Sequence, residues 1–345
     1  MKKVGIIGHY GFGHDLANGQ TIKTKIITEE IEKHLNEKGY LIDVHGGIKI
    51  VIPTVFKSIN ALKNCKNIII MLTENGLKVC VPILSIFNIF FKRSLHYIVI
   101  GGWLASFLKK NKWLIKHLKK FKAIYVETNT MKSALNNLGL CNVIIMPNAK
   151  KLDIVNINKL YLQYNEPFKL CTFSRVMKEK GIEDIIYAII KINEKYCKEI
   201  FNLSIFGEID PKQEVWFKNL KDQFPKYITY KGVIPYSESV SVLQHFFALV
   251  FPTKFFTEGI PGTIIDAYAA GLPVISSKWE SFADVVEDNQ TGLGYTFGDR
   301  DDLCNVLLKI YSNPYLILEM KKNCIIKAHN YTLESTIKIL KDELD

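Results

Sequence analysis

The segment Phe251-Pro-Thr-Lys-Phe-Phe-Thr-Glu258-Gly-Ile-Pro-Gly262-Thr-Ile-Ile-Asp266-Ala-Tyr-Ala-Ala-Gly271-Leu-Pro-Val-Ile-Ser276 joins two short apolar runs through a polar loop and a helical pattern. We predict that a strand ends near Phe251 and that a helix begins near Thr263. Gly262 permits close approach to the backbone, and the first amides of such a helix are unpaired donors at the positive end of its dipole. A strand, loop and helix in this order form a ready phosphate site.

The same alternation of short apolar runs with longer amphipathic stretches continues along the whole chain. In Thr24–Lys38, for example, Ile27, Ile31 and Leu35 recur every four residues, which predicts a helix. Strands alternating with helices form parallel sheets covered on both faces. The predicted strands are Val4–Ile7, Leu41–Val44, Asn67–Leu72, His96–Ile100, Ala123–Val126 and Val143–Met146, then Lys169–Phe173, Phe201–Phe206, Ile228–Lys231, Ala248–Phe251 and Pro273–Ser276.

Two such series predict an α/β fold of two doubly wound, Rossmann-like parallel-sheet domains facing each other across a cleft. A length of 345 residues suits two domains of ordinary size. The stretch Pro147–Pro167 has two prolines, four asparagines and little periodicity, which is typical of a linker. We therefore expect one domain at 1–160, a second at 161–325, and a C-terminal helix at 326–345 that returns to the first domain.

Composition restricts the class of protein. Apolar residues make up 48% and charged residues 23%, as in soluble globular proteins. The formal net charge of +11 either attracts an anionic partner, such as a membrane surface or a phosphate-bearing substrate, or reflects biased residue usage. The seven cysteines form no CxxC pair, which is typical of reduced, buried thiols in a cytoplasmic protein.

No membrane-spanning or targeting segment is predicted. The longest apolar stretch, Val79 to Phe91, has 13 residues, whereas a spanning helix needs roughly 20. The short apolar run at the N-terminus ends in glycines and is interpreted as a first strand, not a signal peptide.

A second strand-to-helix junction, Phe173-Ser-Arg175-Val-Met-Lys-Glu-Lys180-Gly181, places two cations at a carboxyl end. Arg175 offers a planar fork and Lys180 a point charge, so together they could neutralise a diphosphate. Taken alone, the segment has a second interpretation as a solvated basic loop. Glu258 and Asp266 could likewise accept from sugar hydroxyls, or be a solvated loop residue and a partner of the helix dipole.

Together the two segments resemble the donor site of retaining glycosyltransferases of family 4, which have the two-domain GT-B fold. Those enzymes carry a Ser-Arg…Lys-Gly phosphate clamp, two acids eight positions apart and a Gly-x-Pro-Val strand. The matching residues here are Arg175, Lys180, Glu258 with Asp266, and Gly271-Leu-Pro-Val274. Enzymes of this kind build capsule, exopolysaccharide or lipopolysaccharide.

The resemblance implies a role for each matching residue. Arg175 and Lys180 would neutralise the departing diphosphate, and Glu258 would orient the donor sugar. Asp266 would accept from the ribose hydroxyls. A glycine loop after the first strand, a loop around the base and the helix start would complete the donor site through Gly13, Gly19, Val233, Ile234, Pro235, Ile260, Pro261, Gly262 and Thr263.

Two positions depart from the family pattern. The second acid is an Asp, which is one methylene shorter than the usual Glu. The family histidine that follows the fourth strand or so is replaced by Val99-Ile-Gly-Gly-Trp103. The candidates for the acceptor or sugar pocket are His14, Gln20, Gly102 and Trp103. His96 opens an apolar strand, so we expect it to be structural.

The implied reaction is transfer, with retention, of a hexose or N-acetylhexosamine from a nucleotide sugar. UDP is the default nucleotide, and the acceptor would be a glycan or a lipid-linked saccharide of a bacterial surface polysaccharide. The Asp-x-Asp at Asp299–Asp301 opens a late helix, so no metal or other cofactor is required. The alternatives are a nucleotide-sugar epimerase of the same fold and a catalytically silent binding protein. No base-reading motif supports nucleic-acid binding.

The stretch Lys109–Lys122 holds seven lysines interleaved with apolar residues. One interpretation is a basic amphipathic helix on an anionic membrane surface, which would make a cytoplasmic protein peripheral at the inner face of the membrane. The other is a helix whose apolar stripe faces its own sheet and whose lysines are merely solvated.

Overall fold

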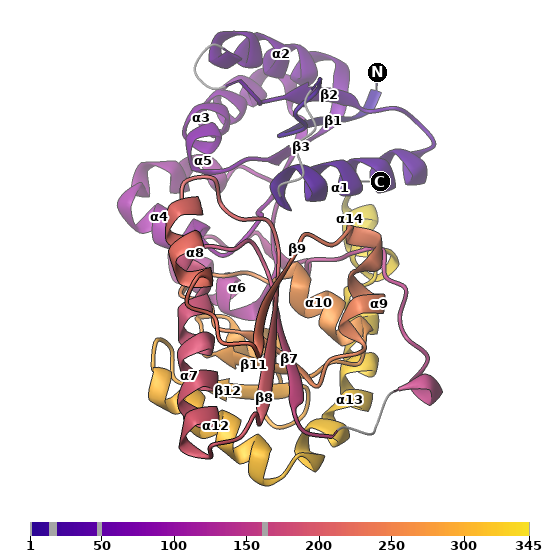
Figure 1. The fold of residues 1–345 in the computed structure, drawn as a ribbon. Coiled ribbons are helices and arrows are strands. Elements are labelled where there is room, and N and C mark those ends of the chain that lie inside the picture. The colour runs from indigo at the N-terminus through magenta and orange to yellow at the C-terminus, as the bar shows by residue number, and fades with distance from the viewer. Residues whose placement is uncertain (1, 14–18, 47–49, 161–164, 345) are drawn as a thin grey trace. The chain divides into compact units, whose positions relative to one another are not determined.

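The alternating apolar runs build two α/β units in the computed structural model, which describes residues 2–13, 19–46, 50–160 and 165–344 (Figure 1). The first unit comprises residues 1–147 and 334–345, and the second comprises residues 148–333. Each has its own parallel sheet of six strands among the described residues.

In the first unit, the sheet has the strand order β2-β1-β3-β4-β5-β6. Its elements are β1 (Lys2–Gly8), α1 (Gly19–Leu35), β2 (Tyr40–Asp43), α2 (Val51–Asn64), β3 (Cys65–Met71), α3 (Glu74–Phe91), β4 (Ser94–Ile98), α4 (Leu104–Lys110), η2 (Lys112–Leu114), α5 (Ile115–Leu118), β5 (Ala123–Val126), α6 (Asn129–Asn136), β6 (Val143–Ile145) and α14 (Leu333–Leu344).

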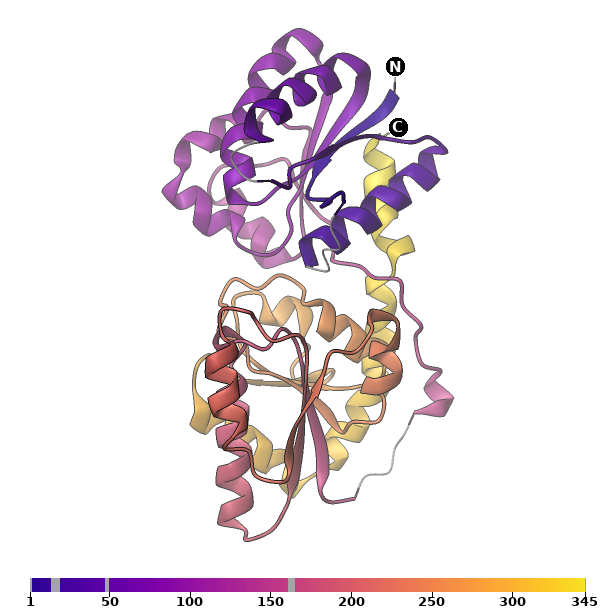
Figure 2. The same ribbon diagram turned by 45° about the horizontal axis from the view of Figure 1, so that its top comes forward.

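Successive side chains of a strand point to opposite faces of its sheet, so β3 contributes to two cores. Ile68 and Ile70 pack with α2 to α6 on one face. Ile69 and Met71 pack with α1 and α14 on the other. Figure 2 shows the yellow α14 beside the indigo α1.

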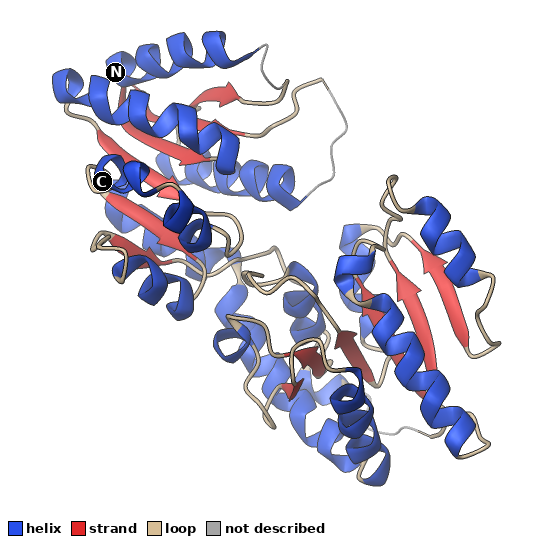
Figure 3. Cartoon of the chain, turned by 90° about the vertical axis from the view of Figure 1, so that its left-hand side faces the viewer, coloured by secondary structure: helices blue, strands red, loops and turns tan. Residues whose placement is uncertain are grey.

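The second unit has the strand order β12-β11-β10-β7-β8-β9, and helices cover both faces of the sheet (Figure 3). Its elements are η3 (Ile157–Lys159), β7 (Phe168–Phe173), η4 (Lys178–Lys180), α7 (Ile182–Lys195), β8 (Phe201–Phe206), α8 (Glu214–Lys221), β9 (Ile228–Gly232), η5 (Tyr236–Glu238), α9 (Ser239–Leu243), β10 (Ala248–Phe251), α10 (Gly262–Ala269), β11 (Val274–Ser277), α11 (Phe282–Val285), β12 (Gly292–Tyr295), α12 (Arg300–Ser312), α13 (Tyr315–Ala328) and η6 (His329–Tyr331).

All the predicted strands are present, and their ends lie within two residues of the predicted ends. The edge strand β12 was not predicted. Its sequence, Gly-Leu-Gly-Tyr, has two glycines, which are depleted in strands and hide the alternating pattern.

The unit boundary after Pro147 differs from the expected boundary at 160/161, because the intervening segment bonds to the second unit. The Asn148 side-chain amide donates to the Ile260 carbonyl at 2.9 Å. The Val155 amide donates to the Ala269 carbonyl, also at 2.9 Å. The linker composition of this stretch therefore coincides with chain that lies along α10.

The C-terminal boundary differs as well, because residues 326–333 stay with the second unit. Ala328 and Tyr331 are buried in the core around α10. The segment that belongs to the first unit is α14 without α13. It is held there by the Asn67 side-chain amide, which donates to the Leu344 carbonyl at 3.0 Å.

Helix α3 is long and apolar enough to cross a membrane, although the sequence led us to expect no such segment. The helix is longer than its apolar run because it begins at Glu74. Only 28% of it is buried. Its buried residues, which include Leu77, Val81 and Leu84, pack in the first core between β3 and β4, where α3 is a crossover helix.

The lysine-rich segment 109–122 is not one helix. Asn111 has a non-helical backbone conformation and separates α4 from η2 and α5. Leu114, Leu118 and Phe121 are buried in the first core. The apolar stripe therefore faces its own sheet, and the seven lysines and Trp113 are exposed.

All seven cysteines are free thiols. Five are buried, as the sequence predicted, whereas Cys141 and Cys197 are exposed. These two lie in loops after α6 and α7, where the chain has left the core.

Gly181 brings the loops after β7 and β10 together. It has φ +69°, and a Cβ there would lie 1.8 Å from the Pro252 carbonyl oxygen. Only glycine permits both the left-handed backbone and this contact. The approach places Lys180 beside the loop that carries Glu258.

We predict that Gly181→Ala lowers the free energy of unfolding by about 2–5 kcal/mol, from left-handed strain plus the clash with Pro252. The matched control is Gly232→Ala, because Gly232 has φ +78° with nothing within 4 Å of a Cβ. The control should lose only about 1–2 kcal/mol. Urea denaturation measures both, and equal losses would show that the close approach is unimportant.

Candidate donor site

The carboxyl ends of β7, β9 and β10 lie at one edge of the second sheet, because the strands are parallel. The loops that follow these strands carry most of the donor-site residues predicted from the sequence. Ligands of doubly wound folds bind at this edge.

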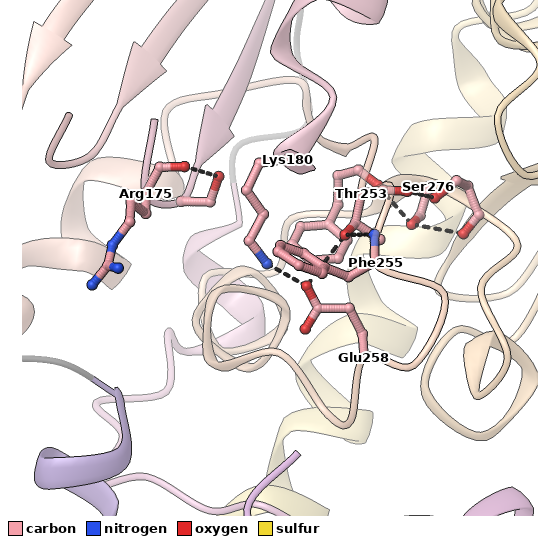
Figure 4. Close-up of polar contacts among 9 residues, drawn as sticks. Arg175, Lys180, Thr253, Phe255, Glu258 and Ser276 are labelled. Atoms are coloured by element: carbon pink, nitrogen blue, oxygen red, sulfur yellow. Dashed lines mark hydrogen bonds and ion pairs between the residues drawn. The ribbon is translucent and has the colours of Figure 1, made fainter. Parts of the chain in front are cut away.

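Lys180 and Glu258 form a half-buried ion pair in which the Lys180 ammonium donates to Glu258 Oε1 (Figure 4). The Thr253 hydroxyl donates to the same oxygen at 3.2 Å. The ammonium also lies 4.8 Å from the ring centroid of Phe255, which is a cation–π distance. The structure thus brings together two of the three residues predicted to be catalytic.

Arg175, the third, stands apart from this pair. It follows β7 and is exposed, and its guanidinium points away from Lys180 and Glu258 (Figure 4). Its contact with Asp210 is long, at 3.8 Å. A surface pair of this length is weak, so the side chain can reorient toward an anion at low cost.

The start of α10 presents unpaired donors. Pro261 precedes the helix, and among the described residues no side chain caps it. Within the described part of the chain, the amides of Gly262 and Thr263 have no hydrogen-bond acceptor, and the buried Thr263 hydroxyl has no partner either. A Cβ on Gly262 would lie 3.7 Å from Lys150 Nζ, so the protein's own packing does not require glycine there. The donors suit an anion at the positive end of the helix dipole.

Asp266, on α10, is engaged by a residue that the sequence pattern did not identify. The ammonium of Lys150 donates to both Asp266 carboxylate oxygens, each at 2.5 Å. Lys150 Nζ also lies 4.1 Å from the centroid of the Tyr236 ring. Both charged residues are buried.

Burial acts on both members of this pair. It raises the pKa of Asp266 and lowers the pKa of Lys150, and each partner's charge opposes the shift of the other. A ribose at this position would therefore meet a carboxylate already shared with an ammonium. Lys150 lies 116 residues from Asp266 in the chain, and no local pattern marks it.

The loop predicted to hold the base follows β9. Val233 and Pro235 are exposed there and Ile234 is partly buried. The next residue, Tyr236, places its ring against Lys150. The base loop and the Lys150–Asp266 pair therefore form one continuous region.

Three candidates from the first unit, Gly13, Gly19 and Gln20, lie between the end of β1 and the first turn of α1. Gly13 and Gly19 are exposed, with no atom within 4 Å of a Cβ at either position. Gln20 is partly buried in the first turn of α1. His14 lies outside the described residues. The glycines are thus free to approach a ligand, but no contact within the described structure requires them.

Trp103 has a structural contact of its own. Its indole N–H donates to the Ile100 carbonyl at 2.9 Å, and its ring packs edge-on against Phe107, with centroids 5.3 Å apart. Gly102 beside it is buried. These bonds fix the loop after β4 and leave part of the Trp103 ring accessible.

His96 is structural, as expected. It is fully buried in β4, and its Nδ1 lies 3.1 Å from the Tyr125 hydroxyl. Burial lowers the pKa of His96 to about 4, so the ring is neutral at physiological pH.

A histidine pair that sequence reasoning missed lies at the carboxyl ends of β1 and β2. His9 Nε2 is 3.1 Å from His45 Nδ1, and His9 Nδ1 is 2.8 Å from the Thr21 hydroxyl. Burial, followed by the charge of His45, lowers the pKa of His9. Their positions in the sequence could have identified them, because His9 directly follows β1 and His45 is the second residue after β2.

Asp43 organises the same loop. Its carboxylate accepts from the amides of Phe12 at 2.8 Å, His45 at 2.9 Å and Tyr10 at 3.0 Å. Burial alone would raise the pKa of Asp43, but these backbone bonds bring it below its ordinary value. The carboxylate therefore remains ionised while it holds His9 and His45 near each other.

A second pair was also missed at this edge. The ammonium of Lys23 on α1 donates to Glu127 Oε1 at 2.5 Å, and Glu127 is buried. The same oxygen lies 3.5 Å from the Gly101 amide. Lys23 and Glu127 are 104 residues apart in the chain, so local sequence could not pair them.

The acids of Asp299–Asp301 open α12, as predicted. The Asp299 carboxylate accepts from the amides of Asp301 and Asp302, at 2.9 and 3.0 Å. It is an N-cap.

The fold and the donor-site geometry define a class of protein: two Rossmann-like units of the GT-B type, with a cation, an acid and a helix N-terminus at one sheet edge. Comparison with solved structures supports this fold. Alr3699/HepE from Anabaena, in complex with UDP, matches with a TM-score of 0.75 over 100% of this chain and 99% of its own, at 14% identity. At this identity the likeness concerns the fold.

The model of the family described as glycosyl transferases group 1 matches residues 156–331. This is half of the chain, and the chain belongs to that family. It is 28% identical over 170 residues to the alpha-monoglucosyldiacylglycerol synthase of Acholeplasma laidlawii, covering 49% of this chain. It is 26% identical over 167 residues, or 46% of this chain, to the capsular polysaccharide biosynthesis glycosyltransferase CapM of Staphylococcus aureus. The matched stretches cover 41% and 42% of these two relatives.

We predict that Lys150→Met lowers the free energy of unfolding by about 3–5 kcal/mol, because it leaves the Asp266 carboxylate buried and unpaired. The double variant Lys150→Met/Asp266→Leu should recover most of this loss, since no buried charge remains. Urea denaturation at pH 7 compares the two. Equal stability of the single and double variants would contradict the pairing.

The loss of unfolding free energy caused by Lys150→Met should also be smaller at acidic pH. Without Lys150, the pKa of folded Asp266 lies further above its unfolded value, so the folded variant binds the extra proton. Its stability therefore falls as pH rises through the window above about 4. The difference from the wild type should be smaller at low pH than at neutral pH. If this difference in stability instead increased on acidification, the pairing of Lys150 with Asp266 would be contradicted.

Proposed function

We propose that this protein is a retaining glycosyltransferase that moves a hexose or N-acetylhexosamine from a UDP-sugar to a glycan or lipid-linked acceptor. The observation that carries the proposal is the Lys180–Glu258 pair beside the unpaired amides of α10. A cation, an acid and a helix start in this arrangement can bind a diphosphate and a sugar at once.

The chemistry follows from where charge develops. When the bond between the anomeric carbon and the diphosphate breaks, negative charge grows on the leaving oxygen. Lys180 and the amides of Gly262 and Thr263 can stabilise that charge without reorganising water, and such preorganised stabilisation accounts for most of the rate enhancement in many enzymes. Arg175 is exposed at the same edge and can turn toward the diphosphate.

Glu258 serves as a positioning acid. A diphosphate at Lys180 would share that cation with Glu258, whose second carboxylate oxygen can accept from a sugar hydroxyl. Its bond from Thr253 limits the rotation of the carboxylate. The group holds the sugar and is not the nucleophile.

The nucleotide half of the donor would lie over α10 and the base loop. We assign the ribose to the Lys150–Asp266 pair and the base to Val233–Pro235, with Tyr236 between them. The bound UDP of Alr3699/HepE supports a uridine donor by similarity of fold.

The acceptor is inferred from the relatives. One is named for capsular polysaccharide and another for a glycolipid, so the proposed product is a bacterial surface glycan or glycolipid made at the inner face of the cytoplasmic membrane. In the first unit, His9 and the Lys23–Glu127 pair lie at strand carboxyl ends and are candidates to receive the acceptor hydroxyl.

We predict that Lys180→Ala and Glu258→Ala each lower turnover by at least about 100-fold, the usual size for the loss of one preorganised electrostatic contact. Turnover is measured as nucleotide release from a panel of nucleotide sugars with saccharide and lipid-linked acceptors. UDP release that depends on acceptor is the expected wild-type result.

The matched control is Lys178→Ala, which removes an exposed lysine from the same loop and should leave turnover near the wild-type value. Normal rates in both site variants would refute the site. Nucleotide binding without turnover across the panel would favour a silent binding protein, and conversion of the sugar without transfer would favour an epimerase.

A further inference from the structure

The net charge of the chain is concentrated in one segment. Residues 44–126 contain 14 of the 45 Lys and Arg residues but one of the 34 Asp and Glu residues, Glu74. This segment therefore has a net charge of +13, and the remainder of the chain has −2. A compositional bias would be spread along the chain, so the concentration indicates a local surface.

The segment contains β3 to β5 as well as α2 to α5, and these helices cover one face of the first sheet. The opposite face is covered by α1 and α14, where six described acids lie: Glu29, Glu30, Glu32, Glu334, Asp342 and Glu343. The first unit therefore has a basic side and a mixed side. Figure 1 shows α2, α3 and α5 on the basic side and α1 with α14 on the other.

Within the basic side, the last turns of α3 expose a cluster of large apolar side chains. Ile86, Phe87, Ile89 and Phe90 are all exposed, and we call them the α3 patch. They lie on the side of the helix opposite its buried residues, which are Leu77, Cys80, Val81, Leu84 and Ser85. A helix that is apolar on both sides needs an apolar environment on its outer side too.

Trp113 and its flanking lysines lie on η2 and α5, two short segments that contact α3. The Trp113 ring lies edge-on to His117, with centroids 6.1 Å apart, and His117 Nδ1 is 2.7 Å from the Ser85 hydroxyl on α3. Trp113 is half exposed, and Lys112 and Lys116 on either side of it are exposed. Lys92, also exposed, follows α3 directly.

We propose that the α3 patch and Trp113 insert into the interface of an anionic lipid bilayer, with Lys92, Lys112 and Lys116 on the lipid phosphates. Exposed apolar residues on α3, an amphipathic Trp on a segment that contacts this helix, and exposed lysines match the layers of that interface. Residues 44–126 contain a single acid, Glu74 in the first turn of α3, and this net positive charge selects an anionic bilayer over a second copy of this chain. A second copy would bring the same positive charge against it.

The α3 patch supplies what the lysine-rich segment lacks. Apart from the exposed Trp113, the apolar residues of 109–122 pack in the first core, so that segment offers charge but little insertion. The helix does not cross the bilayer, since its buried residues hold it between β3 and β4. The proposal deepens the lipid-linked acceptor of the proposed function, but its test measures binding alone.

The test is cosedimentation of the full chain with vesicles of phosphatidylcholine, with and without phosphatidylglycerol. The wild type should pellet with the anionic vesicles, and added salt should release it. The double variant Ile89→Ser/Phe90→Ser should lower the partition coefficient at least about tenfold, because two exposed apolar side chains no longer insert. Lys112→Gln/Lys116→Gln should lower it by about tenfold as well.

The matched control is Val215→Ser/Ile326→Ser in the second unit. Ile326 is 63% exposed against 61% for Ile89, and Val215 is 76% exposed against 79% for Phe90. The control should bind as the wild type does, and all variants should melt at the wild-type temperature. Equal loss in the control and the patch variant would overturn the proposal, as would a wild type that stays in the supernatant.

The remaining alternative is that the α3 patch is the interface of a dimer of this chain. Sedimentation velocity without lipid should show a monomer at all concentrations for the wild type and for Ile89→Ser/Phe90→Ser. A dimer that Ile89→Ser/Phe90→Ser abolishes would assign the patch to a second copy and refute bilayer docking. Because neither assay requires turnover, loss of vesicle binding with intact sugar transfer would leave the proposed reaction standing.

Discussion

The arrangement of the sheet edges depends on one constraint: a charge removed from water needs a countercharge beside it. Three buried or half-buried pairs meet this constraint, namely Lys180–Glu258, Lys150–Asp266 and Lys23–Glu127. Each joins residues from different elements at the carboxyl end of a parallel sheet. The pairs therefore both hold loops in place and keep charges where a phosphate or a sugar hydroxyl can meet them.

The Lys150–Asp266 pair changes how the donor site is understood. The family pattern has a longer acid at this position, and a shorter side chain reaches less far. Here an ammonium occupies the space beside the shorter carboxylate and lies under the ring of Tyr236. Because burial disfavours either charge alone, the two act as one neutral unit. A nucleotide bound beside this pair would meet both a hydrogen-bond donor, Lys150, and an acceptor, Asp266.

The excess positive charge has a structural meaning as well. It is concentrated in residues 44–126, which include the helices on one face of the first sheet and the exposed apolar side chains of α3. The apolar surface comes from α3 and much of the charge from the α4–α5 segment, and the contacts of Trp113, His117 and Ser85 join these two parts of the chain. This positive charge adds little to the stability of the fold, but it gives the first unit a side suited to an anionic surface.

The sequence alone determined every strand except β12, the two α/β series, and the loops that carry Lys180, Glu258 and the start of α10, because periodicity and loop residues act over a few positions. It could not determine the unit boundaries at Pro147 and Leu333, since these depend on which core the linker and α13 contact. Nor could it pair Lys150 with Asp266, which the course of the linker along α10 brings together, or His9 with His45, which follow the paired strands β1 and β2. The α3 patch was hidden for a related reason. An apolar helix shows in its sequence that it avoids water, but only packing against a sheet decides which of its sides stays exposed.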